Sequence, residues 1–175
     1  EVADELRSGL HEVIMTTGAW VTTEGVRTGV SALVGRTVAD IPLEHSPVCV
    51  GFCGWHAVAG HEELDDKDGM AYVYRWDTEH SKEGALLEPH HSHYVLVSAK
   101  PDANHGAKCL CDMSFEVRSA LEEALCPDHE FTDSTRGLVE DEDNIAVPKV
   151  VLVAGGGLMA LRAVHQAVTQ DKRPA

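Results

Sequence analysis

Unbroken apolar segments of strand length are the feature that most restricts how this chain can fold. None of them carries a charged side chain: Val48–Cys53, Tyr94–Val97 and Val150–Ala154. A strand with one face in water would alternate apolar and polar residues, whereas an unbroken run needs cover on both faces, as in a parallel sheet. A fourth strand is expected at Trp20–Thr23, where Trp, Val and Thr favour extended backbone.

Helices are expected between these strands. Apolar residues recur at steps of three and four, the helical period, in four further segments: Val2–Met15, Val30–Ala39, Phe115–Leu125 and Leu158–Val168. Gly18 and Pro127 stand where the first and third of these helices should end. The sequence therefore predicts a single α/β domain over residues 1–175, a three-layer sandwich with a mostly parallel sheet.

The charge of the chain excludes some classes of partner. It has 14 basic and 29 acidic side chains and a net charge of −15, which repels phosphate backbones and anionic lipid heads. Nucleic-acid binding is disfavoured on this ground. No stretch approaches the roughly 18 apolar residues of a membrane span, and the acidic first residues do not suit a secretory leader. We expect a soluble, cytosolic segment without direct membrane insertion.

Residues 128–144 contain seven acids and one base and few apolar residues. They are predicted to form a solvated acidic loop insertion that makes no contribution to the core.

The cysteines and histidines do not predict a disulfide framework or a metal site. The five cysteines are an odd number at irregular spacing, and Cys49 and Cys53 are expected to be small buried apolar residues. Metal-ligating types gather within one stretch, but without the usual Cys-x-x-Cys spacing: His90, His91, His93, His105, Cys109 and Cys111. Alternation along the strand that follows places His91 and His93 on one face, and Ser92 and His93 could instead anchor a loop.

Two glycine-containing loops are placed where an α/β fold binds ligands, between a strand and a helix. They are Thr22–Gly29 and Ala154–Leu158. Glycine allows close approach of a ligand to the backbone, threonine hydroxyls can bind phosphate, and Arg27 adds positive charge. Neither loop matches the dinucleotide fingerprint or the P-loop, and such turns are often purely structural.

Five segments in one order resemble a known family. They are Thr16–Val30, Val50–Trp55, His91–Val97, Glu116–Glu122 and Val147–Gly157. Together they resemble the amino-terminal homology region of melastatin-type TRP channels, a SLOG domain. That domain is a Rossmann-like relative of the lysine-decarboxylase-like nucleotide hydrolases. The resemblance implies one further strand before and one after this chain, which would then be incomplete at both ends.

The resemblance also implies a set of ligand-binding residues. The family's first loop reads approximately Thr-Gly-Gly-Thr-Asn-Thr-Gly-Val, and Glu24 stands where a glycine is usual. Arg118 falls on an arginine of the family that could pair with a pyrophosphate, although a salt bridge to Glu122, four residues on, is an equal alternative. The implied site residues are Thr22, Thr23, Gly25, Thr28, Gly29, Arg118, Gly156 and Gly157.

The function implied by the resemblance is that of a cytosolic ligand-sensing domain of a calcium-permeable cation channel. It would bind ADP-ribose or a related nucleotide at the carboxyl edge of the sheet, without a cofactor, a metal or catalytic residues. Its other partners would be channel domains and the subunits of a homotetramer. Two alternatives are a nucleoside-phosphate hydrolase and a structural module for channel assembly. The hydrolases' glycine-rich catalytic segment is missing from Ala103–Glu116, which disfavours the first.

Overall fold

The computed structural model describes most of the chain, in two compact units. The described residues are 2–64, 74, 84–98, 110–125, 149–157, 160–161, 164–165 and 169. The first unit comprises residues 1–116 and the second residues 117–175. Each unit is treated by itself below. The acidic loop expected at residues 128–144 lies outside the described residues.

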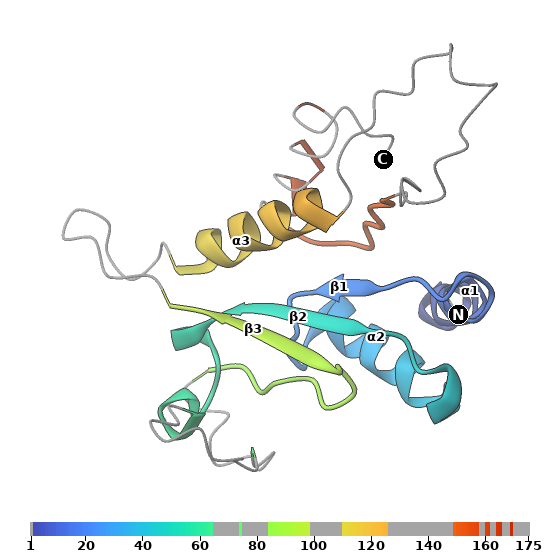
Figure 1. Cartoon of the computed structure of the whole chain (residues 1–175), viewed down its shortest axis with the longest axis horizontal. Helices are drawn as coiled ribbons and strands as arrows, with labels where there is room; N and C mark the ends of the chain where they lie inside the picture. The colour runs from blue at the N-terminus through green and yellow to red at the C-terminus, as the bar shows by residue number, and fades with distance from the viewer. Residues whose placement is uncertain are drawn as a thin grey trace, which may run out of the picture. The chain divides into compact units, whose positions relative to one another are not determined.

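A parallel sheet forms the centre of the first unit (Figure 1). Its three strands are β1 (Val21–Thr23), β2 (Cys49–Gly54) and β3 (His93–Val97), in the order β1-β2-β3. Both pairs are parallel, with Thr22 opposite Val50 and Phe52 opposite Val95. The α/β class and the parallel arrangement predicted from the unbroken apolar runs are confirmed.

Three α-helices of the described residues match predicted ones: α1 (Val2–Thr17), α2 (Gly29–Ala39) and α3 (Leu110–Leu125). Three short 3-10 turns are also present, at Leu43–His45 (η1), Trp55–Ala57 (η2) and His61–Leu64 (η3). As expected, α1 ends at Gly18, which has a φ of 62° and donates its N–H to Ile14 O at 2.9 Å. None of the described helices is long and apolar enough to cross a membrane.

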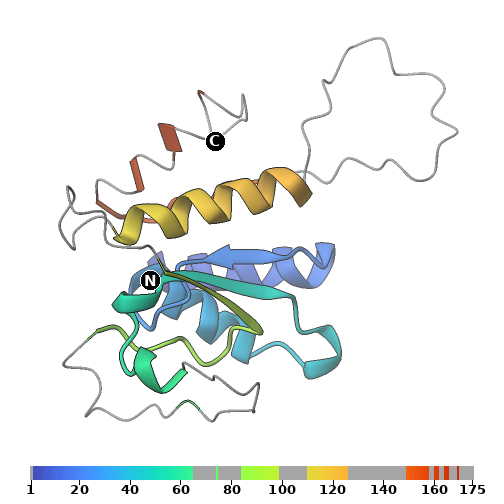
Figure 2. The same ribbon diagram turned by 60° about the vertical axis from the view of Figure 1, so that its left-hand side comes forward.

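One of two core clusters lies where α2 packs against the sheet (Figure 2), and the other is formed by Val26, Cys53, Val58 and Leu87. Val34 and Val38 of α2 form a buried cluster with Cys49 of β2, joined by Leu10 of α1 and Val21 of β1. The apolar face of α2 thus covers the start of the two strands.

The central strand is buried on both of its faces. Cys49 is 0% and Cys53 4% exposed on one face, while Val50 and Phe52 are buried on the other. Burial raises the pKa of each of these two thiols to about 12. Both cysteines are free and uncharged, which confirms that they serve as small apolar residues.

The strand predicted at Val150–Ala154 is wrong. In the described residues 149–157 the backbone joins no sheet, and Val150 is 84% and Leu152 60% exposed. An apolar run favours burial but does not specify which strand its backbone pairs with. The helix predicted from Leu158 is supported at its described positions, which are helical: Ala160, Leu161, Val164 and His165.

Two glycines bring the loop that follows β1 into backbone contact with β2. A Cβ added to Gly25 would stand 2.6 Å from Gly51 Cα, and one added to Gly51 would clash equally with Gly25. Gly25 also has a φ of 69°, in the left-handed region that side chains disfavour. No larger residue fits at either position without moving the backbone.

Gly25→Ala should lower the free energy of unfolding by about 2–4 kcal/mol, through the clash with Gly51 and the strained φ. Urea denaturation measures this directly. Gly9→Ala on α1 is the control, because an added Cβ there meets nothing within 4 Å and should be neutral or slightly stabilising. Equal effects of the two substitutions would show that the loop does not pack on β2 in this way.

Candidate functional site

The predicted phosphate loop follows β1, and three residues of its first half, Thr23, Gly25 and Val26, are buried. Thr23 is 8% exposed, and its hydroxyl accepts the N–H of Gly25 at 2.8 Å. The same oxygen lies 2.7 Å from His91 Nε2, in a buried hydrogen bond between residues 68 positions apart. Thr22 is half-buried within β1. The Thr23 hydroxyl therefore holds the fold together and is not presented to solvent.

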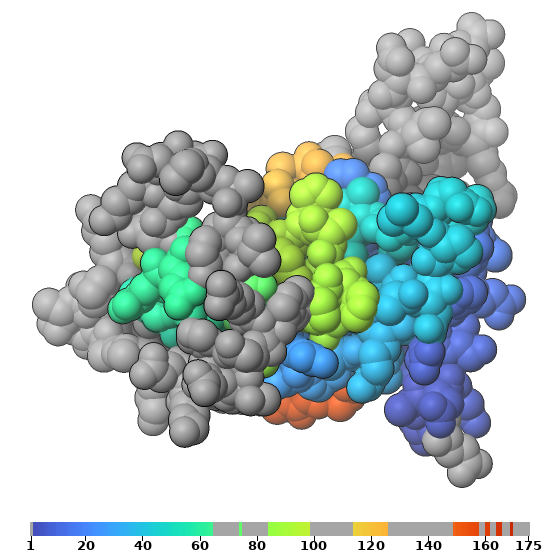
Figure 3. Space-filling model, turned by 90° about the horizontal axis from the view of Figure 1, so that it is seen from below, coloured from blue at the N-terminus to red at the C-terminus, as the bar shows by residue number. Residues whose placement is uncertain are grey.

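The segment that leads into β3 covers this half of the loop. Arg27 N–H donates to Leu86 O at 2.7 Å, and Glu88 N–H donates to Gly25 O at 2.9 Å. Figure 3 shows this light-green segment beside α2, from a direction that looks onto it. Gly25 is thus closed in from two sides, by β2 and by this segment.

The second half of the loop is exposed and leads into α2. Arg27, Thr28 and Gly29 are all exposed. Thr28 has the extended conformation of an N-cap residue, with φ −139° and ψ 157°, but its side chain makes no cap hydrogen bond. The first N–H groups of a helix have no intrahelical partner, and together with the helix dipole they favour an anion. Glu24, which is also exposed, places a negative charge on the same loop.

Glu88 is a buried acid that was not predicted from the sequence. It is 3% exposed, and its Oε1 lies 3.0 Å from His90 Nδ1. Its backbone carbonyl accepts the hydroxyl hydrogen of Tyr94. A Cβ on Gly35 of α2 would overlap the Glu88 side chain, so this glycine makes room for it. In the sequence, the signal for this contact was Gly35, a glycine in the middle of a predicted helix.

His91 and His93, around the start of β3, do not share an environment. His91 precedes the strand and is 6% exposed, whereas His93 is exposed. Burial lowers the pKa of His91, an effect that His90 reinforces and that Glu88 opposes. Ser92 fulfils the alternative role of a loop anchor, because its Oγ accepts Cys49 N–H at 2.8 Å and donates to Cys49 O at 3.0 Å.

The remaining predicted site residues belong to the second unit. Arg118 Nε lies 3.4 Å from Glu122 Oε1, and Lys149 Nζ lies 2.5 Å from Glu122 Oε2. The salt bridge to Glu122, one of the two roles considered for Arg118, is therefore present. Gly156 has a φ of 112° and Gly157 is exposed, so the closing glycine turn exists. Thr22, Thr23, Gly25, Thr28 and Gly29 thus follow one another in the first unit, whereas Arg118, Gly156 and Gly157 belong to the second unit.

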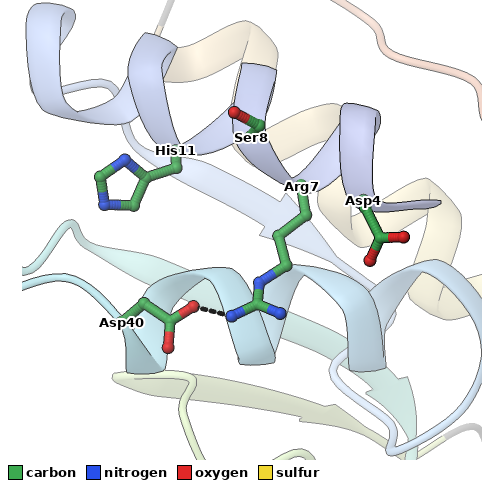
Figure 4. Close-up of a pocket in the computed structure, with 5 residues that line it drawn as sticks. All are labelled: Asp4, Arg7, Ser8, His11 and Asp40. Atoms are coloured by element: carbon green, nitrogen blue, oxygen red, sulfur yellow. Dashed lines mark hydrogen bonds and ion pairs between the residues drawn. The ribbon is translucent and has the colours of Figure 1, made fainter. Parts of the chain in front are cut away.

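A cavity of about 370 Å³ lies elsewhere, between α1 and the end of α2 (Figure 4). Arg7 of α1 reaches across it and is bonded to the carboxylate of Asp40, which follows α2. The guanidinium is therefore already neutralised by an acid. The other residues that line the cavity are Asp4, Ser8 and His11. This cavity was not predicted, and its mixed charges do not favour an anion.

Comparison with known proteins identifies the family to which this α/β domain belongs. The fold and the glycine loop define a Rossmann-like α/β domain. A family model described as "SLOG in TRPM" matches residues 1–175, the whole chain. The chain belongs to this family, as the resemblance implied.

Named relatives agree with the family assignment. The chain is 31% identical to transient receptor potential cation channel subfamily M member 2 of Rattus norvegicus, over 93% of this chain and 10% of the relative. It is 29% identical to a subfamily M member-like 2 protein of Nematostella vectensis, over 97% of this chain and 10% of the relative. For transient receptor potential cation channel trpm of Drosophila melanogaster the identity is 30%, over 95% of this chain and 8% of the relative. The chain thus spans about a tenth of the length of these relatives.

His91 should make the first unit less stable in mild acid. Its folded-state pKa is lowered from 6.5, so the unfolded chain binds a proton more readily and stability falls as pH drops below about 6.5. One proton contributes at most about 1.4 kcal/mol per pH unit. Urea denaturation between pH 7.5 and 5.5 measures the slope. His91→Gln, which can still bond Thr23, should flatten it, whereas His93→Gln at the exposed neighbour should not. An unchanged slope in His91→Gln would contradict the assignment.

Proposed function

We propose that this chain is the ligand-sensing SLOG domain of a TRPM-like, calcium-permeable cation channel. It binds ADP-ribose or a related nucleotide at the carboxyl edge of its sheet. It acts on the cytoplasmic side of the membrane, within a homotetramer and against other domains of the channel. The relatives are named as cation channels, which supports this proposal over a separate nucleoside-phosphate hydrolase.

The observation that carries the nucleotide proposal is the exposed, uncapped start of α2. The first backbone N–H groups of α2, those of Gly29 to Ser31, come before the first intrahelical bond, which Ala32 N–H donates to Thr28 O at 3.2 Å. Arg27 supplies a positive charge two residues before Gly29. A phosphate bound there would replace the missing side-chain cap and would gain from the helix dipole. Thr28 adds a hydroxyl beside the same N–H groups.

The buried half of the loop has a supporting role in this proposal. Thr23 and Gly25 are held by His91, Glu88 and β2, so they fix the path of the backbone up to Arg27. A site whose backbone is fixed before the ligand arrives loses less entropy on binding. We propose that these residues bind nucleotide only indirectly, by positioning Thr28 and Gly29.

The net charge of −15 does not by itself exclude an anionic ligand. Screening acts over about 8 Å at physiological salt, so the groups nearest the ligand decide the sign of the local field. On this loop they are Arg27 and the helix N-terminus against Glu24.

A structural module for channel assembly is the second candidate. It is favoured by the same packing of Thr23 and Gly25, because a loop that the fold itself needs would be retained without any ligand. The salt bridge between Arg118 and Glu122 agrees with it as well. Arg118, Gly156 and Gly157 remain proposed ligand-binding residues of the second unit. The change in nucleotide affinity on Arg118→Ala tests whether Arg118 contributes to binding.

The loop charges should change nucleotide affinity in opposite directions. Arg27→Ala should weaken ADP-ribose binding about tenfold, the loss of one charge-assisted hydrogen bond, while Glu24→Gln should strengthen it. Isothermal titration calorimetry of the purified chain measures both. Arg36→Ala is the matched control, because it removes the same charge from an exposed position near the other end of α2.

Two results would overturn the nucleotide proposal. One is the absence of binding of ADP-ribose and of AMP to a chain with a native circular dichroism spectrum. The other is an equal loss of affinity in Arg27→Ala and Arg36→Ala, which would show a general charge effect. Either result leaves the structural module as the function.

A further inference from the structure

Two histidines meet directly after β2, in a part of the molecule to which the proposed function gives no role. The turns η2 and η3 place His56 Nδ1 3.3 Å from His61 Nε2. Their rings are close to perpendicular, at 83°, with centroids 5.1 Å apart. His56 is exposed and His61 half-buried, and the green segment that holds them reaches the surface in Figure 3.

The orientation of His61 is fixed by its other contacts. Its Nδ1 lies 2.9 Å from Val58 O, and because a carbonyl can only accept, Nδ1 carries the hydrogen. Its Nε2 therefore presents a lone pair toward His56. The ring also packs edge-on against Trp55, with centroids 5.6 Å apart. Histidines that bind metals commonly donate their second N–H to a backbone carbonyl in this manner.

The distance between the two nitrogens suits a tetrahedral metal ion. Two imidazole nitrogens at Zn–N distances of about 2.0–2.1 Å stand about 3.3–3.4 Å apart when the angle at the metal is tetrahedral. Without a metal, His56 donates its Nδ1–H to His61. With a metal, His56 takes its other neutral tautomer, with the hydrogen on Nε2, and both facing nitrogens offer lone pairs.

We propose that His56 and His61 form a surface site for a divalent late transition metal, with Zn²⁺ as the first choice. His56 Nδ1 and His61 Nε2 are its two protein ligands, and water fills the remaining positions. Among the residues that the structure describes, no group of three or more His, Cys, Asp or Glu side chains is placed to hold a metal. Two imidazole donors select zinc, copper or nickel over Mg²⁺ and Ca²⁺, which prefer oxygen.

The test must resolve individual side chains, because the chain has 11 histidines and 5 cysteines. The side-chain nitrogens of the ¹⁵N-labelled chain are followed by NMR while ZnCl₂ is added. We expect the first equivalents to shift His56 Nδ1 and His61 Nε2, and millimolar Mg²⁺ to shift neither.

Variants give the second readout, by competition for zinc with a chromophoric chelator. His56→Asn and His61→Gln should each bind one Zn²⁺ fewer than the unsubstituted chain, whereas His45→Asn, an exposed histidine in η1, should bind the same number. His56→Asn changes an exposed side chain, so it reports on the site even if His61→Gln disturbs the fold. Unmoved nitrogens, or unchanged zinc stoichiometry in His56→Asn, would show that the pair forms only an imidazole hydrogen bond.

Discussion

The close approach of Gly25 to Gly51 determines how the chain leaves its sheet. Because neither residue has a Cβ, the loop after β1 lies directly on β2 before it turns into α2. Its backbone is then free to bond with the segment before β3, through Gly25 O and Glu88 N–H at 2.9 Å. A buried hydrogen bond between Thr23 and His91, 2.7 Å long, ties the end of β1 to the same segment. The end of β1, the buried residues of the loop and the segment before β3 are thus bonded together, and the exposed start of α2 follows them.

The elements of the fold that depend on composition alone could be predicted from the sequence. An unbroken apolar run such as Val48–Cys53 needs cover on both faces, and β2 is indeed buried and parallel to both neighbours. The same reasoning failed at Val150–Ala154, because apolar character states that a segment prefers burial and not which strand accepts its backbone. Helix periods were more reliable, since α1 and α2 satisfy their own hydrogen bonds locally.

The sequence indicated where a candidate site lies, but not which of its residues are buried and which are exposed. A strand, a glycine loop and a helix start are local signals, and the structure confirms that order from β1 to α2. Whether a hydroxyl such as that of Thr23 faces a ligand or a distant residue depends on packing. His91 lies 68 positions away, and no residue near Thr23 in the sequence predicts this hydrogen bond. Glu88 was missed for the same reason, because a buried acid is recognised only by what surrounds it.

Backbone amide NMR during a titration with ADP-ribose tests the division of this loop most directly. If the exposed half binds the ligand and the buried half only supports it, the amide signals of Gly29, Val30 and Ser31 shift with saturation. Those of Thr23 and Gly25 then stay near their free positions. Shifts confined to other parts of the chain, or none at saturating ligand, would contradict the proposal that the start of α2 is the nucleotide site.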